Sequence, residues 1–220
     1  MAGMTGVNKR PYQSRLRAQR AEQTRARILD AARDLFLANG YVRATTAAIA
    51  THAGVSEAML FAAFGTKAGV LEALIGRAVV DDQAPVALRD RPVWAGLAAE
   101  YDDPRAAVRR FAETIAAIQQ RTWRLIELTR AASDADEAMA RLLAQGAANR
   151  RADCRDFVEH VIAAGLRADL TPAEAADVLW LYSSADVYRL LVGTAAWTHE
   201  RYAAWLADTL ARALLEDPAS

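Results

Sequence analysis

Threonine and serine hydroxyls stand among small apolar side chains over residues 45–64, where the chain reads TTAAIATHAGVSEAMLFAAF. Two short helical stretches meet there around Gly54, which can adopt the positive φ that a tight turn between helices requires. Ser56 is suited to cap the second stretch. Such a pair can insert its second helix into the major groove of DNA while the first crosses the phosphate backbone. The spacing predicts a helix-turn-helix, although a purely structural helical hairpin would show the same pattern.

Positive charge gathers in the same part of the chain. Residues 1–80 carry 11 Lys and Arg against 5 Asp and Glu, a net charge of +6, and residues 81–220 carry the compensating −6. A basic first third and an acidic remainder indicate two regions with different partners. The cations at the start of the chain favour either a solvated terminus or an arm that binds nucleic acid. They are Lys9, Arg10, Arg15, Arg17, Arg20, Arg25 and Arg27.

Catalytic chemistry finds little support in the sequence. His52 and His199 are isolated, and Asp156 with His160 offers only two ligands, which do not make a metal site. Cys154, the single cysteine, lies on an apolar stripe and is expected to be a small core residue rather than a redox switch. Neither a G-x-S-x-G motif nor a phosphate-binding glycine loop occurs. We therefore predict no catalytic residue, no metal site and no cofactor.

The composition is typical of a folded globular protein, with 53% hydrophobic and 25% charged residues in a chain of 220. Helix formers dominate and no segment alternates with a period of two, so we predict an all-α fold of about nine helices. The sequence has neither an apolar run long enough to span a membrane nor a secretory signal, so we expect a cytoplasmic protein. The helices are expected over residues 18–39, 46–53, 56–64, 66–80, 93–101, 104–133, 135–164, 172–193 and 198–215.

The segment from Arg27 onward reads RILDAARDLFLANGYVRATTAAIATHAGVSEAMLFAAFGTKAGVL and resembles the DNA-binding domain of the TetR family of transcriptional repressors. The resemblance implies a homodimer in which three N-terminal helices bind DNA and a larger helical domain binds a small ligand and the second subunit. We accordingly expect a basic flexible arm at residues 1–17, a helix-turn-helix domain at 18–65, and a ligand-binding and dimerisation domain at 66–220. The residues that carry the resemblance are Ile28, Leu29, Asp30, Ala31, Ala32, Leu35, Phe36, Gly40, Tyr41, Thr45, Thr46, Ile49, Ala50, Ala53, Gly54, Val55, Ser56, Leu60, Phe64, Lys67 and Leu71.

Phosphate contacts are implied at two positions of this segment. We expect Thr46 to cap the helix over residues 46–53, and in the family its hydroxyl and backbone N–H face a phosphate. Lys67 lies in the first turn of the following helix, where the macrodipole disfavours a cation unless a phosphate is bound. The alternative for Lys67 is a solvated surface lysine. Where the family usually has a tyrosine, this chain has Phe61, which lacks the phosphate-binding hydroxyl.

The second helix of the pair, residues 56–64, offers no Arg, Asn or Gln for a bidentate bond to a base. Alanine and methionine can still contact thymine methyl groups, so the operator sequence stays open. The residues expected to contact DNA are Arg15, Arg17, Arg20, Arg43, Thr45, Thr46, Ser56, Glu57, Ala58, Met59, Phe61, Ala62 and Lys67.

A cation, Arg150, falls in phase with an apolar stripe between Leu143 and Phe157. It could extend its charge to the surface or pair with an acid on a neighbouring helix, or it could be a pocket cation for an anionic ligand. Aromatic residues on the other helices could line a cavity or belong to the core. The residues expected to bind the small-molecule effector are Trp94, Phe111, Ile115, Trp123, Arg150, Cys154, Phe157 and Trp180.

The expected helix over residues 172–193 is apolar on two faces, which requires two partners. One is its own core, and the other is expected to be the same helix of a second subunit, completed by the last helix. The residues expected at this dimer interface are Val178, Leu181, Tyr182, Ala185, Tyr188, Trp205, Leu206 and Leu210.

These features together predict a ligand-responsive DNA-binding regulator, a homodimer released from a palindromic operator by a small molecule. The alternative is a dimeric helical enzyme or small-molecule carrier whose N-terminal hairpin is only structural.

Overall fold

The computed structural model describes residues 9–80 and 103–216, with the side chains of residues 17–80 and 103–216. The described residues form an all-α structure whose one β-bridge joins Leu166 to Leu215. The chain divides into two compact units, Met1–Leu74 and Ile75–Ser220, so the division falls at residue 74 rather than after residue 65. The expected helix over residues 93–101, which includes Trp94, lies outside the described residues.

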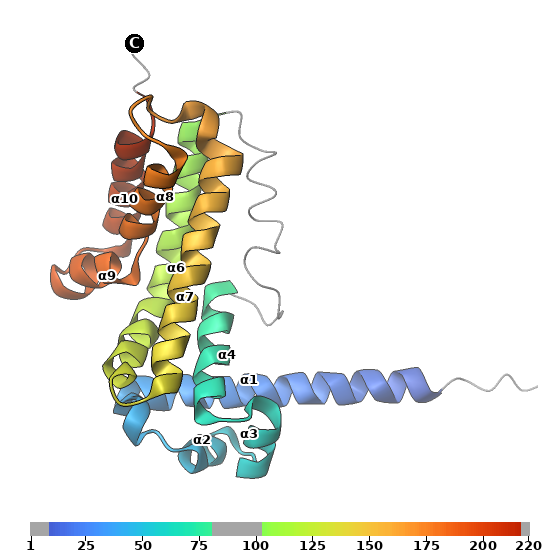
Figure 1. Cartoon of the computed structure of the whole chain (residues 1–220). Helices are drawn as coiled ribbons and strands as arrows, with labels where there is room; N and C mark the ends of the chain where they lie inside the picture. The colour runs from blue at the N-terminus through green and yellow to red at the C-terminus, as the bar shows by residue number, and fades with distance from the viewer. Residues whose placement is uncertain (1–8, 81–102, 217–220) are drawn as a thin grey trace, which may run out of the picture. The chain divides into compact units, whose positions relative to one another are not determined.

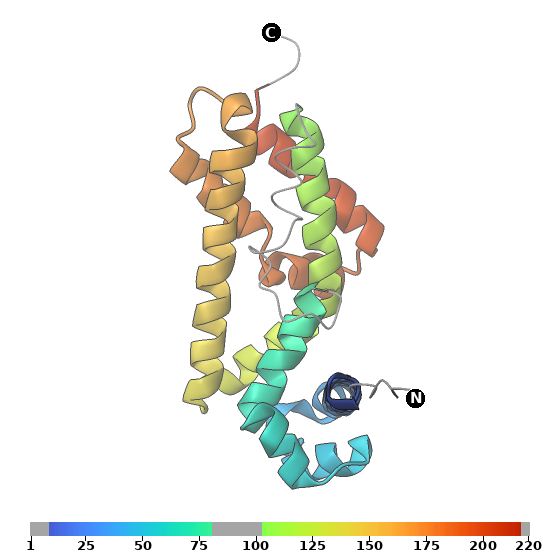
Figure 2. The same ribbon diagram turned by 90° about the vertical axis from the view of Figure 1, so that its right-hand side faces the viewer.

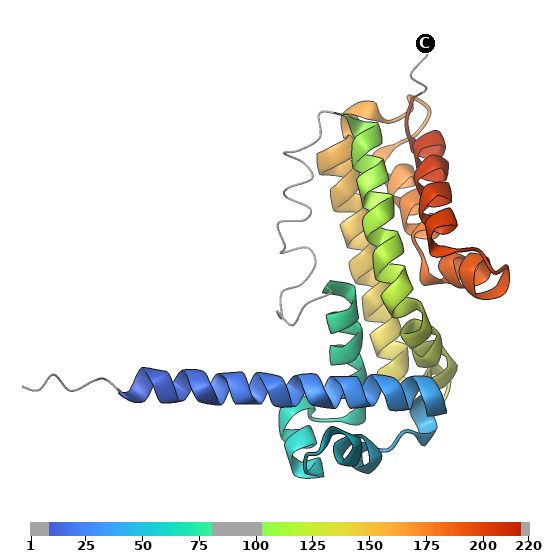
Figure 3. The same cartoon turned by 180° about the vertical axis from the view of Figure 1, so that it is seen from behind.

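The first unit packs four helices around one small core. α1 (Lys9–Arg43), α2 (Thr46–Ala53), α3 (Glu57–Phe64) and the start of α4 (Lys67–Val80) contribute fully buried side chains. α1 begins at Lys9, so the expected flexible arm is wrong for residues 9–17, which continue the helix past the part that packs on α2 and α3 (Figure 3). The core side chains include Ile28, Ala32 and Phe36 of α1, Ile49 of α2, Leu60 of α3, and Val70 and Leu71 of α4.

The second unit is built on two long neighbouring helices, α6 (Pro104–Ser133) and α7 (Glu137–Phe157). α8 (Pro172–Tyr182) packs on α7, and α10 (His199–Leu214) packs on α6 and α8 (Figures 1 and 2). The helix starts carry the expected local signals, including a capping box in which Thr171 and Glu174 bond to each other's backbone N–H. Among the described residues, no single helix is long and apolar enough to cross a membrane.

The single helix expected over residues 172–193 is wrong, because the chain breaks at Ser183 and Ser184. It continues as the short α9 (Ala185–Tyr188) and a π-helical segment, Arg189–Thr194. The Ser184 hydroxyl accepts a hydrogen bond from the Val187 amide at 3.3 Å, and the Ser183 carbonyl accepts one from Gln119 Nε2 at 2.6 Å. Serine side chains compete with the helical ladder in this way and favour a new helix start. The helix expected over residues 135–164 likewise leaves α geometry at Phe157, where a π-helical and then a 3₁₀ segment follow.

Candidate nucleic-acid interface

The turn between α2 and α3 is closed by three local devices. The Thr45 hydroxyl accepts a hydrogen bond from the Ala48 amide at 3.1 Å, and the Ser56 hydroxyl accepts one from the Met59 amide at 3.2 Å. Gly54 has φ 65° and ψ 40°, the left-handed conformation that glycine adopts without strain. The two helices are consequently bent by 104°. The predicted turn is confirmed, but the cap of α2 is Thr45 and not Thr46.

Thr46 instead joins the starts of the two helices, because its hydroxyl donates to the carboxylate of Glu57. Both residues were expected to contact DNA. The bond holds Glu57 in place at the first position of α3, where an acid is favoured by the helix macrodipole. A carboxylate has more than one acceptor site, so this bond is compatible with a contact between Glu57 and a base amino group.

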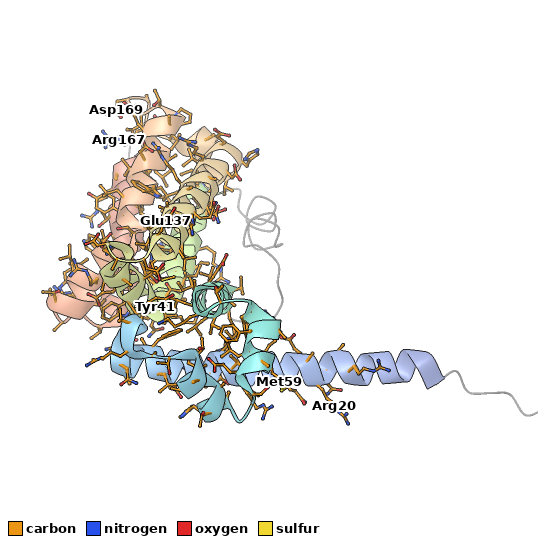
Figure 4. The ribbon with its side chains drawn as sticks, turned by 60° about the horizontal axis from the view of Figure 1, so that its bottom comes forward. Arg20, Tyr41, Met59, Glu137, Arg167 and Asp169 are labelled. Carbon is orange, nitrogen blue, oxygen red and sulfur yellow. The ribbon has the colours of Figure 1, made fainter. Side chains whose placement is uncertain are left out.

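The outward face of α3 is apolar. Leu60 is fully buried and anchors the helix, whereas Met59 and Phe61 are 46% and 44% exposed and Ala58 and Ala62 are exposed as well. Figure 4 shows Met59 on this helix. A solvated helix of a folded domain normally carries polar groups on its outer face. Side chains of this kind, left uncovered on the second helix of a helix-turn-helix, match the methyl groups of thymine in a major groove.

Arg25 fixes the far end of α3 against α1, a role that the sequence did not reveal. Its guanidinium donates a hydrogen bond to the carbonyl of Ala63 and lies 4.2 Å from the centre of the Phe64 ring. A cation is favourable at the C-terminus of a helix, where carbonyl groups lack partners. Arg25 therefore positions α3, although the sequence pattern placed it among the arm cations.

Lys67 is half-buried and tied to the end of α1, so it is not the solvated surface lysine of the alternative reading. Its Nζ donates to the carbonyl of Tyr41 at 3.0 Å and lies 4.2 Å from the centre of the Tyr41 ring. Tyr41 follows Gly40, where α1 is kinked by a positive φ of 77°. The ammonium group has three donors, so contact with a phosphate remains compatible with this bond.

We predict that replacing Lys67 by methionine lowers the stability of the protein and weakens DNA binding evenly across operator variants. A hydrogen bond from a charged group to a partly buried carbonyl stabilises a protein by about 1.5 kcal/mol. Thermal unfolding measures the first effect, and binding to operators that differ only in their base pairs measures the second. An unchanged melting temperature would show that the Tyr41 contact contributes nothing to stability.

The expected cationic contacts of this group all lie on α1. Arg17 and Arg20 are exposed on the long helix, where Figure 4 labels Arg20. Arg15 belongs to the same helix, but its side chain lies outside the described ones. Arg43 is exposed, and its Nε donates to the carbonyl of Asn39 at 2.9 Å. Their contact with DNA stays a prediction.

The described residues that were expected to bind a ligand form two groups in the second unit, one apolar and one more polar. Phe111 and Phe157 pack their rings 4.6 Å apart, and with Ile115 and Cys154 they are buried in the core of this unit. Burial raises the pKa of the Cys154 thiol to about 11, so it stays protonated at neutral pH. Trp123 is half-buried beside Gly193.

Arg150 and Trp180 form the more polar group. One Arg150 nitrogen donates to the carbonyl of Trp180 and to the hydroxyl of Ser183, and the guanidinium lies 5.0 Å from the centre of the Trp180 ring. Arg150 forms no ion pair with any carboxylate that the structure describes. Of the alternatives for Arg150, pairing with an acid on a neighbouring helix is not seen among the described residues, where its hydrogen-bond partners are Trp180 and Ser183. Effector binding by both groups of residues stays a prediction.

The residues expected at a dimer interface divide into two groups. Leu206 and Leu210 are fully buried in the core of their own subunit, and Tyr188 is only 2% exposed. Leu206 and Leu210 lie on α10, which packs on α6, and Tyr188 lies on α9 after the chain break. Because all three side chains are buried within one subunit, they have no exposed area to offer to a second subunit. Leu181, by contrast, is 56% exposed. The half-buried members of the expected set are Val178, Tyr182, Ala185 and Trp205.

Comparison with known proteins places the helix-turn-helix in a family. Residues 28–74 match the family model described as bacterial regulatory proteins, tetR family. The HTH-type transcriptional regulator YvkB of Bacillus subtilis (strain 168) is 48% identical over 54 residues, which are 24% of this chain and 29% of that protein. The match with this curated relative thus spans less than a third of its length.

Solved structures share the fold over most of the chain. Native NalD, the secondary repressor of the MexAB-OprM multidrug efflux pump in Pseudomonas aeruginosa, has a TM-score of 0.68 at 18% identity, with 90% of this chain and 99% of NalD covered. The complex of SmeT with triclosan has a TM-score of 0.68 at 20% identity, with 89% and 93% covered. A transcriptional regulator from Saccharomonospora viridis in complex with choline has a TM-score of 0.62 at 18% identity, with 88% and 98% covered.

A helix-turn-helix followed by a larger helical unit defines a class of DNA-binding regulators. The match over residues 28–74 assigns the first unit to the TetR type, and the shared fold extends the likeness to the second unit. Residues 28–74 thus form a DNA-binding domain of the TetR type, and most of the chain shares the fold of solved regulators.

Proposed function

We propose that this protein is a cytoplasmic repressor that binds a pseudo-palindromic operator as a homodimer and leaves it when a small-molecule effector binds the second unit. The two α3 helices of such a dimer would enter successive major grooves, about 34–36 Å apart. An effector that favours a different separation of these helices would release the DNA through its different affinities for the two states.

The observation that best supports this proposal is the outward face of α3. Its apolar side chains are exposed although Leu60 anchors the helix, and Arg25 and Glu57 hold both of its ends. A hairpin with a purely structural role would bury such side chains rather than leave them in water. This argues against the alternative of an enzyme or carrier with a structural hairpin. The small molecules bound by SmeT and by the S. viridis regulator, triclosan and choline, support an effector role for the second unit.

Footprinting on the DNA that flanks the protein's own gene tests the proposal. We expect a protected palindrome that resists competitor DNA. Weak, salt-sensitive protection without a defined boundary would favour the enzyme or carrier instead.

The apolar face of α3 also predicts how the operator is read. Replacing thymine by uracil within the protected half-sites removes only the C5-methyl group, and we expect about fourfold weaker binding for each methyl group in contact, from about 0.8 kcal/mol per buried carbon. Replacing Ala62 by glutamine should shift the preference toward adenine at one position. Uracil placed outside the half-sites is the control. Equal affinities for thymine and uracil half-sites would show that the methyl groups are not read.

A further inference from the structure

Two buried hydrogen-bond donors of the second unit, on Tyr202 and Trp180, have no acceptor among the described residues. Tyr202 is 0% exposed, and its hydroxyl has no hydrogen-bond partner among the described residues. The indole N–H of Trp180 is also buried without a partner in this part of the chain. A buried donor without an acceptor destabilises a fold, so two in one unit call for a group that the described residues do not supply.

Arg150 brings charge to the same region. Only one of its nitrogens, Nη1, donates to described residues. Arg150 forms no ion pair with a described carboxylate, although the charge of Asp186, which pairs with Arg130, acts on it. Burial lowers the pKa of Arg150 and raises the pKa of Tyr202, and the positive charge of Arg150 opposes the rise at Tyr202. A largely desolvated guanidinium is costly without a compensating anion.

Aromatic rings surround these donors. The Tyr202 ring lies 4.7 Å from the Tyr188 ring and 6.0 Å from the Trp205 ring, measured between centres. Arg150 itself stacks over the Trp180 ring at 5.0 Å. α7, α8 and α10 therefore present three N–H or O–H donors next to apolar ring surfaces.

We propose that this cluster binds the planar carboxylate of an aromatic or arylaliphatic acid. The free Arg150 nitrogens would hold the carboxylate in the bidentate geometry that a guanidinium favours, the Tyr202 hydroxyl and the Trp180 N–H would donate to its oxygens, and the rings would cover its apolar body. A cationic ligand is disfavoured, because the cluster already carries the positive charge of Arg150. The inference rests on the proposed function only where it calls this acid the effector.

The place of Arg150 also links the ligand to the face expected to bind a second subunit. Its guanidinium holds the Trp180 carbonyl, and the next residue is the exposed Leu181. A carboxylate that draws the guanidinium away would free the last turn of α8, next to the break at Ser183. Binding would thus bias the segment that orients the two subunits.

Isothermal titration calorimetry of the full-length protein without DNA tests the site. The probes are benzoate, 3-phenylpropionate and 1-naphthoate, each compared with its primary amide, which has the same shape without the charge. We expect at least one acid to bind ten times more tightly than its amide. If every acid binds no more tightly than its amide, the proposal is wrong.

The variant Tyr202→Phe tests whether the Tyr202 hydroxyl binds a ligand or an ordered water molecule. The change removes only a hydroxyl that has no partner among the described residues, so the free protein should melt at the same or a higher temperature while acid binding weakens about tenfold. Thr114→Ala, which removes an exposed hydroxyl of the same unit that bonds to the Arg110 carbonyl of its own helix, is the control and should leave acid binding unchanged. Unchanged acid binding by Tyr202→Phe, or a lower melting temperature, would show that water serves the hydroxyl and would overturn the proposal. An acid that binds with this dependence but leaves operator affinity unchanged would uphold the site and refute only its role as effector.

Discussion

Replacing Leu181 by glutamate is expected to give a monomer that no longer protects the operator. Leu181 is 56% exposed on α8, whose opposite face packs through Ala175, Ala176 and Leu179 into its own unit. A twofold axis at this face would bury two carboxylates without partners, each at a cost on the order of several kcal/mol. Sedimentation velocity measures the oligomeric state, and an operator-binding assay measures the loss of simultaneous contact with both half-sites.

Leu190→Glu is the matched control for this prediction. Leu190 is 51% exposed in the same unit, but it lies after the chain break in the π-helical segment. We expect this variant to stay dimeric and to bind operator as the unmodified protein does. A Leu181→Glu protein that remains dimeric would mean that another surface joins the subunits.

The second large effect is expected from the long first helix. Arg17 and Arg20 are three residues apart on one side of α1 and are exposed, so the helix can hold both cations along one line of phosphates. Each phosphate neutralised changes the slope of log affinity against log salt by about 0.9. Replacing both residues by glutamine should flatten that slope by about 2–4 for a dimer, and should weaken operator binding at least about a hundredfold at 0.05 M salt.

Arg141→Gln provides the control for this change of charge. Arg141 is an exposed arginine of α7 in the second unit, where it pairs with Glu137 at 2.6 Å. Its loss should leave the salt slope unaltered, and circular dichroism should show that α1 stays helical in the double variant. If the Arg17 and Arg20 variant keeps both affinity and slope, the helix-turn-helix binds the operator without help from α1.

The sequence predicted those features that local interactions decide. The bounds Thr46–Ala53 and Pro104–Ser133 were predicted correctly, because each helix start carries its own hydroxyl or carboxylate cap. The positive φ of Gly54 and the capping box at Thr171 follow from residues within a few positions of one another. A helix-turn-helix is one such local structure, so the segment from Arg27 to Leu71 showed the resemblance to the TetR family from the sequence alone.

Other features depend on side chains that lie far apart in the chain. The break after Tyr182 depends on Gln119 and Arg150, which reach the end of α8 from two other helices. Because the periodicity of one helix does not show which neighbours it has, residues 172–193 were predicted as one uninterrupted helix.

The direction of each side chain was likewise decided by packing. Leu206 and Leu210 lie on an apolar stripe of α10 that either its own core or a second subunit could cover, and packing on α6 and α8 assigned them to the core. The same packing left the Tyr202 hydroxyl without an acceptor among the described residues. In the first unit, the packing of α4 on α1 tied Lys67 to the carbonyl of Tyr41. The sequence by itself determined which residues form helices and which stretch can enter DNA, since propensities and caps act over a few residues. Only the tertiary structure decided which faces are buried and which donors remain unpaired, since burial depends on contacts between distant parts of the chain.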